Sequence, residues 1–302
     1  MRAIRAVMGL ALSTGLVVAM AGCSQHNDAA SDNSVVASTS IWGNVASAVA
    51  GDHASVKSII SNPADDPHSF EASPADAASI ADASLVVYNG GGYDHWVDDV
   101  LSSHRNVQAV DAYSLLPSNV QQPANEHVFY DLGTVTAAVN QIAAKLSESD
   151  TAHADDYKAN AAKFADAAET IATAERAIGA AHPGASVVAT EPVAHYLLVN
   201  SGIVDKTPEG FSNAIEQDTD PSPADLAALL DLIKTRQVSA LVYNSQTQTA
   251  VTKQIQDAAQ QASVPIVTVT ETLPAGIGYL TWQRQTVDQL ASQLDKAPRT
   301  NR

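Results

Sequence analysis

The sequence predicts an α/β fold of two similar lobes, with mainly parallel sheets, joined by a single long helix. Two observations lead to this prediction. Short β-branched runs alternate with helical patterns from Ser34 onward, and one long helical pattern without turn signals lies between two sets of runs. Such alternation is typical of parallel sheets. We therefore expect a first lobe over 34–150, a linking helix over 151–183 and a second lobe over 184–302.

The predicted strands are six short apolar runs, three in each lobe. The first lobe has them at 34–39, 54–60 and 84–89, and the second at 186–190, 238–243 and 265–270. A helix is predicted over 134–146, where apolar residues share one face. In the linking helix, apolar residues at spacings of 4, 3, 4, 3 and 7 form one stripe of a helix. This stripe consists of Tyr157, Ala161, Phe164, Ala168, Ile171 and Ile178.

Two helix starts follow the same plan and support the division into similar lobes. Ser73 and Ser222 each begin a Ser-Pro-Ala-Asp segment, in which the serine is the expected N-cap and the proline the first helical residue. The aspartates at 76 and 225 complete a short capping box. Because any capped helix before a strand has this plan, the likeness gives mild support only.

The N-terminal residues have the pattern of an export signal. Two arginines precede an apolar stretch, and small residues then lead to Cys23, the only cysteine of the chain. The segment Met20-Ala21-Gly22-Cys23 resembles a bacterial lipobox, in which the cysteine becomes the lipidated first residue. We expect a signal peptide over 1–22 and a lipidated, flexible tether over 23–33. The alternative is an ordinary secretory signal with a chance cysteine.

The charge of the chain excludes several kinds of partner. The sequence has 33 acidic and 16 basic residues, which gives a formal net charge of −17. This charge argues against nucleic-acid binding, which needs a basic face, and against electrostatic docking on anionic lipid. It is compatible with a protein that attracts cations. The single cysteine excludes an internal disulfide.

Four candidate metal ligands lie in loops beside the predicted strands and helices. Ligand sites in parallel α/β sheets form beyond the carboxyl ends of the strands, and a site between the lobes would collect all four. Two imidazoles and two carboxylates suit zinc, manganese or iron. Taken singly, each residue has an ordinary interpretation as a polar loop residue or a cap. The candidates are His68 and His127 in the first lobe and Glu191 and Glu271 in the second.

Four segments of the chain, in order, resemble one family of proteins. ADDPHSFEASPAD at 64–76 is similar to a DPH-x-(Y/F)-x-x-(S/T)-P-x-D pattern, and NEHVFYDL at 125–132 is similar to a D/N-P-H-x-W-x-D block. The segments 187–203 and 264–294 are similar to the strands that carry ligands in the second lobe of the same family. These patterns belong to the metal-binding solute receptors of bacterial zinc, manganese and iron ABC importers, which have a rigid linking helix.

The resemblance implies a metal site in the cleft between the lobes, with His68, His127, Glu191 and Glu271 as ligands. His195 competes with Glu191 for the third position, but Glu191 directly follows its strand. Asp66 and Asp131 are expected either to orient the imidazoles or to serve as caps and solvated charge. The chain departs from the family in three ways. Glu271 stands where aspartate is common, and the segment at 242–246 lacks the acid of the family's F-x-E-P-Q-like segment. The His-rich loop that many zinc receptors carry is absent at 117–126.

The resulting hypothesis is a lipid-anchored receptor on the outer face of the cytoplasmic membrane, not an enzyme. It is expected to be a monomer that binds one Zn²⁺ or Mn²⁺ and delivers the ion to the permease of an ABC importer. Zinc is favoured because it binds more tightly than manganese at most sites with nitrogen and oxygen ligands. One alternative is a receptor for a metal chelate such as a siderophore or haem. Another is a secreted zinc hydrolase, although the sequence has no HExxH segment or nucleophile elbow.

Overall fold

The computed structural model describes residues 34–65, 67–120, 124–217 and 219–297. The expected signal peptide, Cys23 with its tether, and Asp66 lie outside this range. Among the described residues, no helix combines the length and the apolarity that a membrane span requires.

The first lobe contains a parallel sheet of four strands in the order β2-β1-β3-β4. The register places Val36 beside Lys57 on one side and Val86 on the other. The strands are β1 (Ser34–Thr39), β2 (Ser55–Ile60), β3 (Leu85–Tyr88) and β4 (Gln108–Asp111). The helices are α1 (Ser40–Ala50), α2 (Pro74–Ala81), α3 (His95–Ser103) and α4 (Leu132–Ser149), with short 3-10 turns η1 (Tyr113–Leu115) and η2 (Val128–Tyr130).

The second lobe repeats this topology, with a parallel sheet in the order β6-β5-β7-β8. Its strands are β5 (Ser186–Ala189), β6 (Val204–Asp205), β7 (Ala240–Asn244) and β8 (Ile266–Val269). Its helices are α6 (His195–Asn200), α7 (Glu209–Glu216), α8 (Pro223–Lys234) and α9 (Ala250–Ala262), with the 3-10 turn η4 (Pro192–Ala194). In both lobes the strand order reverses beside the first strand, which is where ligand sites form in such sheets.

All six predicted strands are confirmed within two residues at each end, and the α/β class is confirmed. The strands β4 and β6 were not predicted, since one is short and partly polar and the other has two residues. The two predicted N-caps and the proline at each helix start are also confirmed, whereas the full capping box forms at Ser73 and not at Ser222. Ser73 accepts a hydrogen bond from the backbone N–H of Asp76 at 3.3 Å, and Ser222 accepts one from Asp225 at 3.1 Å.

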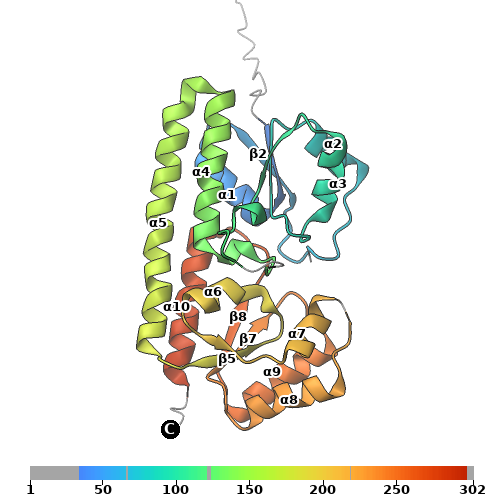
Figure 1. Ribbon diagram of the computed structural model, residues 1–302, viewed down its shortest axis with the longest axis vertical. Coiled ribbons are helices and arrows are strands. Elements are labelled where there is room, and N and C mark those ends of the chain that lie inside the picture. The colour runs from blue at the N-terminus through green and yellow to red at the C-terminus, as the bar shows by residue number, and fades with distance from the viewer. Residues whose placement is uncertain (1–33, 66, 121–123, 218, 298–302) are drawn as a thin grey trace, which may run out of the picture. The chain divides into compact units, whose positions relative to one another are not determined.

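One long helix runs along both lobes, and a second long helix lies beside it along the second lobe (Figure 1). The linking helix α5 (Ala154–Ala181) follows the 3-10 turn η3 (Thr151–His153), packs against α4 and α1 of the first lobe, and reaches α6 of the second. Every residue of its predicted apolar stripe is buried. The last helix, α10 (Tyr279–Lys296), lies beside α5 and also contacts α1. The backbone N–H of Tyr279 donates to Asn44 of α1 at 2.7 Å, so the C-terminal segment is tied to the first lobe as well.

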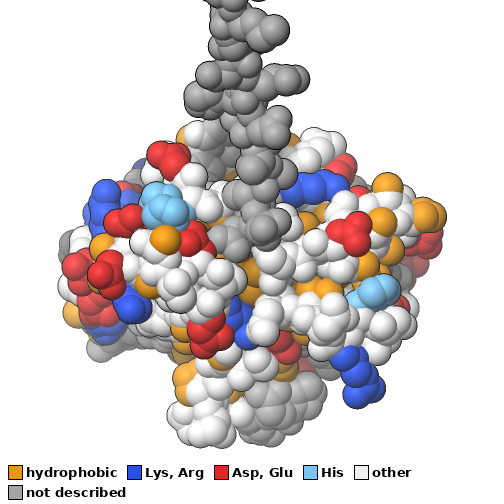
Figure 2. Space-filling model, turned by 90° about the horizontal axis from the view of Figure 1, so that it is seen from above, with side chains coloured by type: hydrophobic (Ala, Val, Ile, Leu, Met, Phe, Trp, Pro, Cys, Tyr) orange, Lys and Arg blue, Asp and Glu red, His pale blue; other side chains and the backbone are white. Residues whose placement is uncertain are grey.

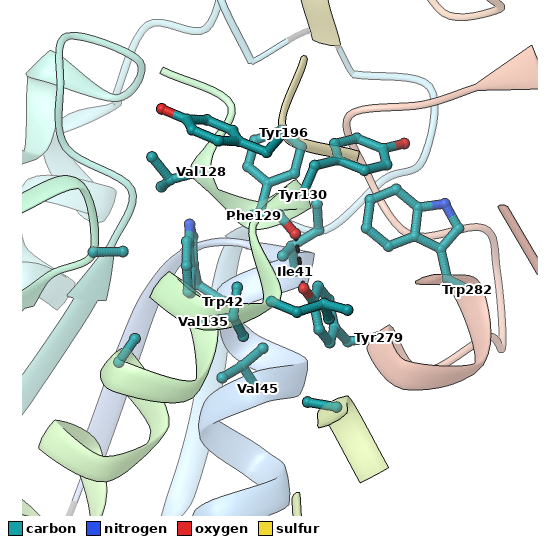
Figure 3. Packing of buried hydrophobic residues seen from close by; sticks show 14 of the residues in the cluster. Ile41, Trp42, Val45, Val128, Phe129, Tyr130, Val135, Tyr196, Tyr279 and Trp282 are labelled. Atoms are coloured by element: carbon teal, nitrogen blue, oxygen red, sulfur yellow. Dashed lines mark hydrogen bonds between the residues drawn. The ribbon is translucent and has the colours of Figure 1, made fainter. Parts of the chain in front are cut away.

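The largest buried cluster connects the lobes rather than filling each one separately (Figure 3). Trp42 of α1, Phe129 and Tyr130 of η2, and Tyr279 and Trp282 of α10 pack together there. The hydroxyl of Tyr279 donates to the carbonyl of Phe129 at 2.8 Å. Because η2 follows His127 directly, this core fixes the backbone that carries one candidate ligand.

The acidic residues of the chain are not gathered into one patch on the face drawn in Figure 2. Among the residues coloured there, acidic side chains are interspersed with basic, histidine and apolar ones. Most of the negative charge on this face is therefore ordinary solvated surface.

Candidate metal centre

The candidate ligands come from loops at the carboxyl ends of strands in both lobes. His68 lies between β2 and α2, and His127 lies between β4 and α4, directly before η2. Glu191 and Glu271 each follow a strand of the second sheet by two residues, β5 and β8 respectively. The loops of the two sheets meet, so residues about 200 positions apart in sequence are in contact.

His68, His127 and Glu271 form a tight cluster. The Oε2 of Glu271 lies 3.0 Å from the Nε2 of His68 and 3.4 Å from the Nε2 of His127. The hydroxyl of Tyr93 donates to the same oxygen at 3.3 Å. Both imidazoles therefore point one nitrogen at the same carboxylate oxygen. These distances between nitrogen and oxygen match the separation of two ligand atoms that bind one metal ion at bond lengths near 2.1 Å.

His127 offers an unused lone pair in the interior. Its side chain is 2% exposed, and among the residues that the structure describes its buried Nε2 has no hydrogen-bond partner. The other ring nitrogen, Nδ1, lies 3.1 Å from the Oδ1 of Asn125, which also accepts the backbone N–H of His127 at 2.9 Å. Because that oxygen can only accept, the proton of the neutral ring belongs on Nδ1, and Nε2 is left free to bind a cation.

Asn125 also connects this histidine to the second lobe. Its amide nitrogen lies 3.3 Å from the carbonyl of Pro192 and 3.4 Å from Glu216. The backbone carbonyl of Asn125 accepts a hydrogen bond from the hydroxyl of Tyr196 at 2.6 Å. The residue therefore holds His127 in place from both sides of the cleft.

Glu191 joins the cluster through Asn244, the last residue of β7. The amide nitrogen of Asn244 donates to Glu191 at 2.5 Å and to Glu271 at 2.8 Å, and the hydroxyl of Thr247 donates to Glu191. Burial raises the pKa of Glu191, and these two donors offset part of the rise. Asn244 occupies the segment in which the family pattern has an acid, and here it separates two carboxylates that would otherwise repel each other.

Glu271 is held as an anion despite its burial. Burial alone would raise its pKa, but the neighbouring imidazoles of His127 and His68 favour the charged carboxylate, outweigh that effect and keep the pKa well below its usual range. Its backbone N–H donates to the side chain of Gln246, whose amide in turn donates to the carbonyl of Pro63 at 2.8 Å in the His68 loop. The ligand loops of the two lobes are thus linked by hydrogen bonds.

Glu126 was not predicted as a site residue. Its Oε1 lies 3.4 Å from the Nδ1 of His68, and one ligand atom from each of His68, Glu126 and His127 falls within 4.8 Å of the others. A loop glutamate beside a histidine has no periodicity or spacing that would have identified it. The turn Gly90-Gly91-Gly92, with positive φ of 75°, 67° and 95°, leads directly into Tyr93 and passes close to the Glu126 carboxylate.

The remaining sequence candidates lie at the margin. His195 begins α6 with an exposed side chain. Asp131 is the N-cap of α4: it accepts from Gly133 and Thr134 and from Asn200 of the second lobe at 3.3 Å. The side chain that faces the Nδ1 of His127 is that of Asn125 instead.

A cavity of about 260 Å³ opens onto the cluster from between the lobes. His68, His127 and Glu191 form its inner end, and residues of α7 and the start of α9 form its walls. Its volume lies below the range of pockets for drug-sized ligands. The cavity suits an ion with a few water molecules better than a haem or siderophore.

Comparison with known proteins identifies one family. The family model described as ZnuA, zinc-uptake complex component A, periplasmic, matches residues 35–293. The manganese-binding lipoprotein MntA of Bacillus subtilis is 26% identical over 239 residues, which cover 75% of this chain and 76% of that protein. The manganese ABC transporter substrate-binding lipoprotein PsaA of Streptococcus pneumoniae is 21% identical over 317 residues, 98% of this chain and 100% of that protein.

A solved structure agrees with these matches. The laminin-binding protein Lmb of Streptococcus agalactiae, described as a bifunctional protein with adhesin and metal transporting activity, superposes with a TM-score of 0.74 at 26% identity. The alignment covers 87% of this chain and 99% of that one.

Proposed function

The chain belongs to the family of the periplasmic zinc-uptake component A, and from this premise we propose that it binds one divalent transition-metal ion between its lobes for an ABC importer. It is a metal-binding substrate receptor and not an enzyme. The observation that carries the proposed site is the buried Nε2 of His127, which has no hydrogen-bond partner in the described part of the chain and lies 3.4 Å from the Oε2 of Glu271. A buried nitrogen left unpaired is costly unless a ligand uses it.

The proposed ligands are His68, His127, Glu191 and Glu271. Two neutral imidazoles and two carboxylates compensate the charge of a divalent ion and replace its water shell. Binding requires the Asn244 amide to give up its hydrogen bonds to the carboxylate oxygens that turn to the ion. Asn125 keeps the ring of His127 in the tautomer that binds metal.

We propose Zn²⁺ as the tightest-binding ion, with Mn²⁺ as its close competitor. Zinc outranks manganese at most nitrogen and oxygen sites under the Irving–Williams order. The family model is a zinc-uptake component, whereas the names of the two relatives specify manganese. Two carboxylates among four ligands also suit manganese or iron better than a three-histidine set would.

We further propose that Cys23 carries the lipid that holds the receptor on the outer face of the cytoplasmic membrane. The lipobox-like segment and the lipoprotein names of the relatives support this anchor. The released ion would pass to the membrane permease of the same importer. Mass spectrometry of the membrane-extracted protein tests the anchor, because a diacylglycerol adduct on a chain that begins at Cys23 is expected.

Metal titration of the purified chain tests the proposed site. We expect one tightly held divalent ion per chain, and loss of that ion in the double variant His68→Ala/His127→Ala. The matched control is His53→Ala/His153→Ala. It removes two stacked histidines, with ring centroids 3.9 Å apart, that lie away from the site, where the first lobe contacts the start of α5. Unchanged stoichiometry and affinity in the first variant would refute the site. Competition between Zn²⁺ and Mn²⁺ for the same chain then determines the preferred ion.

A further inference from the structure

The two ring nitrogens of His68 face two different carboxylates. Nε2 lies 3.0 Å from Glu271 Oε2, and Nδ1 lies 3.4 Å from Glu126 Oε1. The lone pairs of the two nitrogens diverge across the ring, so one ion cannot occupy both directions. An ion bound beside Glu271 therefore uses Nε2 and leaves Nδ1 to the Glu126 carboxylate.

From this arrangement we infer that Glu126 is a positioning residue for His68: it accepts the Nδ1–H and so turns the Nε2 lone pair toward the metal. The inference rests on the proposed function and adds a residue to it. The same relationship is already present at the neighbouring ligand, where the Oδ1 of Asn125 lies 3.1 Å from the Nδ1 of His127. Two consecutive residues thus orient both imidazoles.

The backbone around Glu126 is fixed well enough for this task. Its carbonyl accepts hydrogen bonds from the Asn89 amide at 2.8 Å and from the backbone N–H of Val128 at 2.7 Å. Its side chain is 25% exposed, and a β-carbon added at Gly92 would lie 3.9 Å from its Oε2. The carboxylate therefore stands between the glycine turn and the His68 ring.

The sequence around Glu126 differs from the family pattern at this position. The D/N-P-H block has proline before the histidine, and proline has no acceptor in its side chain. A carboxylate here increases the basicity of the imidazole it contacts, and residues that orient metal-binding histidines in this way typically change metal affinity 10- to 100-fold.

The experiment compares Zn²⁺ affinity of the full chain, purified in detergent, with that of three variants. Glu126→Ala should weaken binding about 10- to 100-fold, while Glu126→Gln, which keeps an acceptor oxygen, should lose well under tenfold. Glu148→Gln replaces an exposed carboxylate of α4 that does not line the cavity, and this variant should bind as the unaltered chain does. Because the Glu126 side chain is partly exposed, its truncation leaves no buried cavity, and circular dichroism verifies folding.

Two spectroscopic readouts separate positioning from other roles. Long-range ¹H–¹⁵N correlation of the zinc-loaded chain should show His68 protonated at Nδ1, with a His68→Ala sample identifying its signals. X-ray absorption should give the same number of nitrogen and oxygen ligands to Zn²⁺ with and without the Glu126 carboxylate. Wild-type affinity in Glu126→Ala, or one oxygen fewer around its zinc, would overturn the inference. Failure of the unaltered chain to bind metal would instead refute the proposed function.

Discussion

Replacement of Glu175 by glutamine probes an acid buried in the linking helix. The apolar stripe of α5 skips from Ile171 to Ile178, and the position between them on the same face is Glu175, which is 1% exposed. Neither carboxylate oxygen has a hydrogen-bond partner within the described ranges of the chain. Burial raises the pKa of Glu175 to about 8, the charge of Asp131 adds to the rise, and the charge of Arg176 offsets part of it.

The sign of the effect follows from the protons bound in each state. Between pH 4.5, the ordinary value for this group, and about pH 8, the folded chain keeps the Glu175 proton while the unfolded chain loses it. The folded state is therefore favoured at low pH, and this stability is lost as the pH rises toward 8. By pH 7 the loss is on the order of 3 kcal/mol. Glutamine has nearly the same shape and does not titrate, so Glu175→Gln should remove this pH dependence.

Urea unfolding at pH 5 to 8, with a chelator present to exclude bound metal, measures the difference. The free energy of unfolding of Glu175→Gln minus that of the unaltered chain should be small at pH 5 and increase steadily to pH 7. The control is Glu169→Gln on the same helix, an exposed carboxylate paired with Arg176 at 2.5 Å, for which a change within about 1 kcal/mol is expected. A difference for Glu175→Gln that does not vary with pH would refute the reasoning.

Three further substitutions test the site, a cap and the core. Asn125→Ala should weaken Zn²⁺ binding about 10- to 100-fold, because the tautomer of His127 is then no longer fixed. Asn125→Asp keeps the acceptor oxygen and should weaken binding less. Equal affinities for Asn125→Ala and the unaltered chain would contradict this prediction. Ser222→Ala removes the cap of α8 and should lower the free energy of unfolding by about 1 kcal/mol in urea titrations; no change would show that the cap is not stabilising. Phe164→Ala should cost about 3 to 5 kcal/mol by the same assay, against a small effect for the exposed neighbour Lys163→Ala, and similar effects for the two would contradict the packing described.

The sequence predicted the lobes and the linking helix because both have a regular signal. The strands are β-branched runs bounded by polar loops, and the stripe from Tyr157 to Ile178 follows helical spacing closely. The strands β4 and β6 had too few apolar residues to be recognised. The position of α10 against α1 depends on tertiary packing that no local pattern encodes.

The site was predictable only in part for a similar reason. His68, His127, Glu191 and Glu271 follow strands or precede a helix. In the structure the first three line one cavity, and the Asn244 amide links Glu191 to Glu271. Their assignment as ligands stays a proposal. Asn125, Glu126 and Asn244 act through short contacts between loops, and such contacts depend on how two lobes meet rather than on spacing in the chain.

The hydrogen bond between the Tyr279 hydroxyl and the Phe129 carbonyl affects the order in which the chain can fold. The two residues are 150 positions apart, and the hydroxyl of Tyr130 likewise donates to Thr270 at 2.9 Å. Domains usually complete their cores from the N-terminus as the chain is made. Here the aromatic core beside His127 lacks its last partners until residues 270–282 have emerged. The hydrophobic core of the first lobe is therefore completed last, although this lobe is synthesised first. A chain that ends before Tyr279 would lack part of that core.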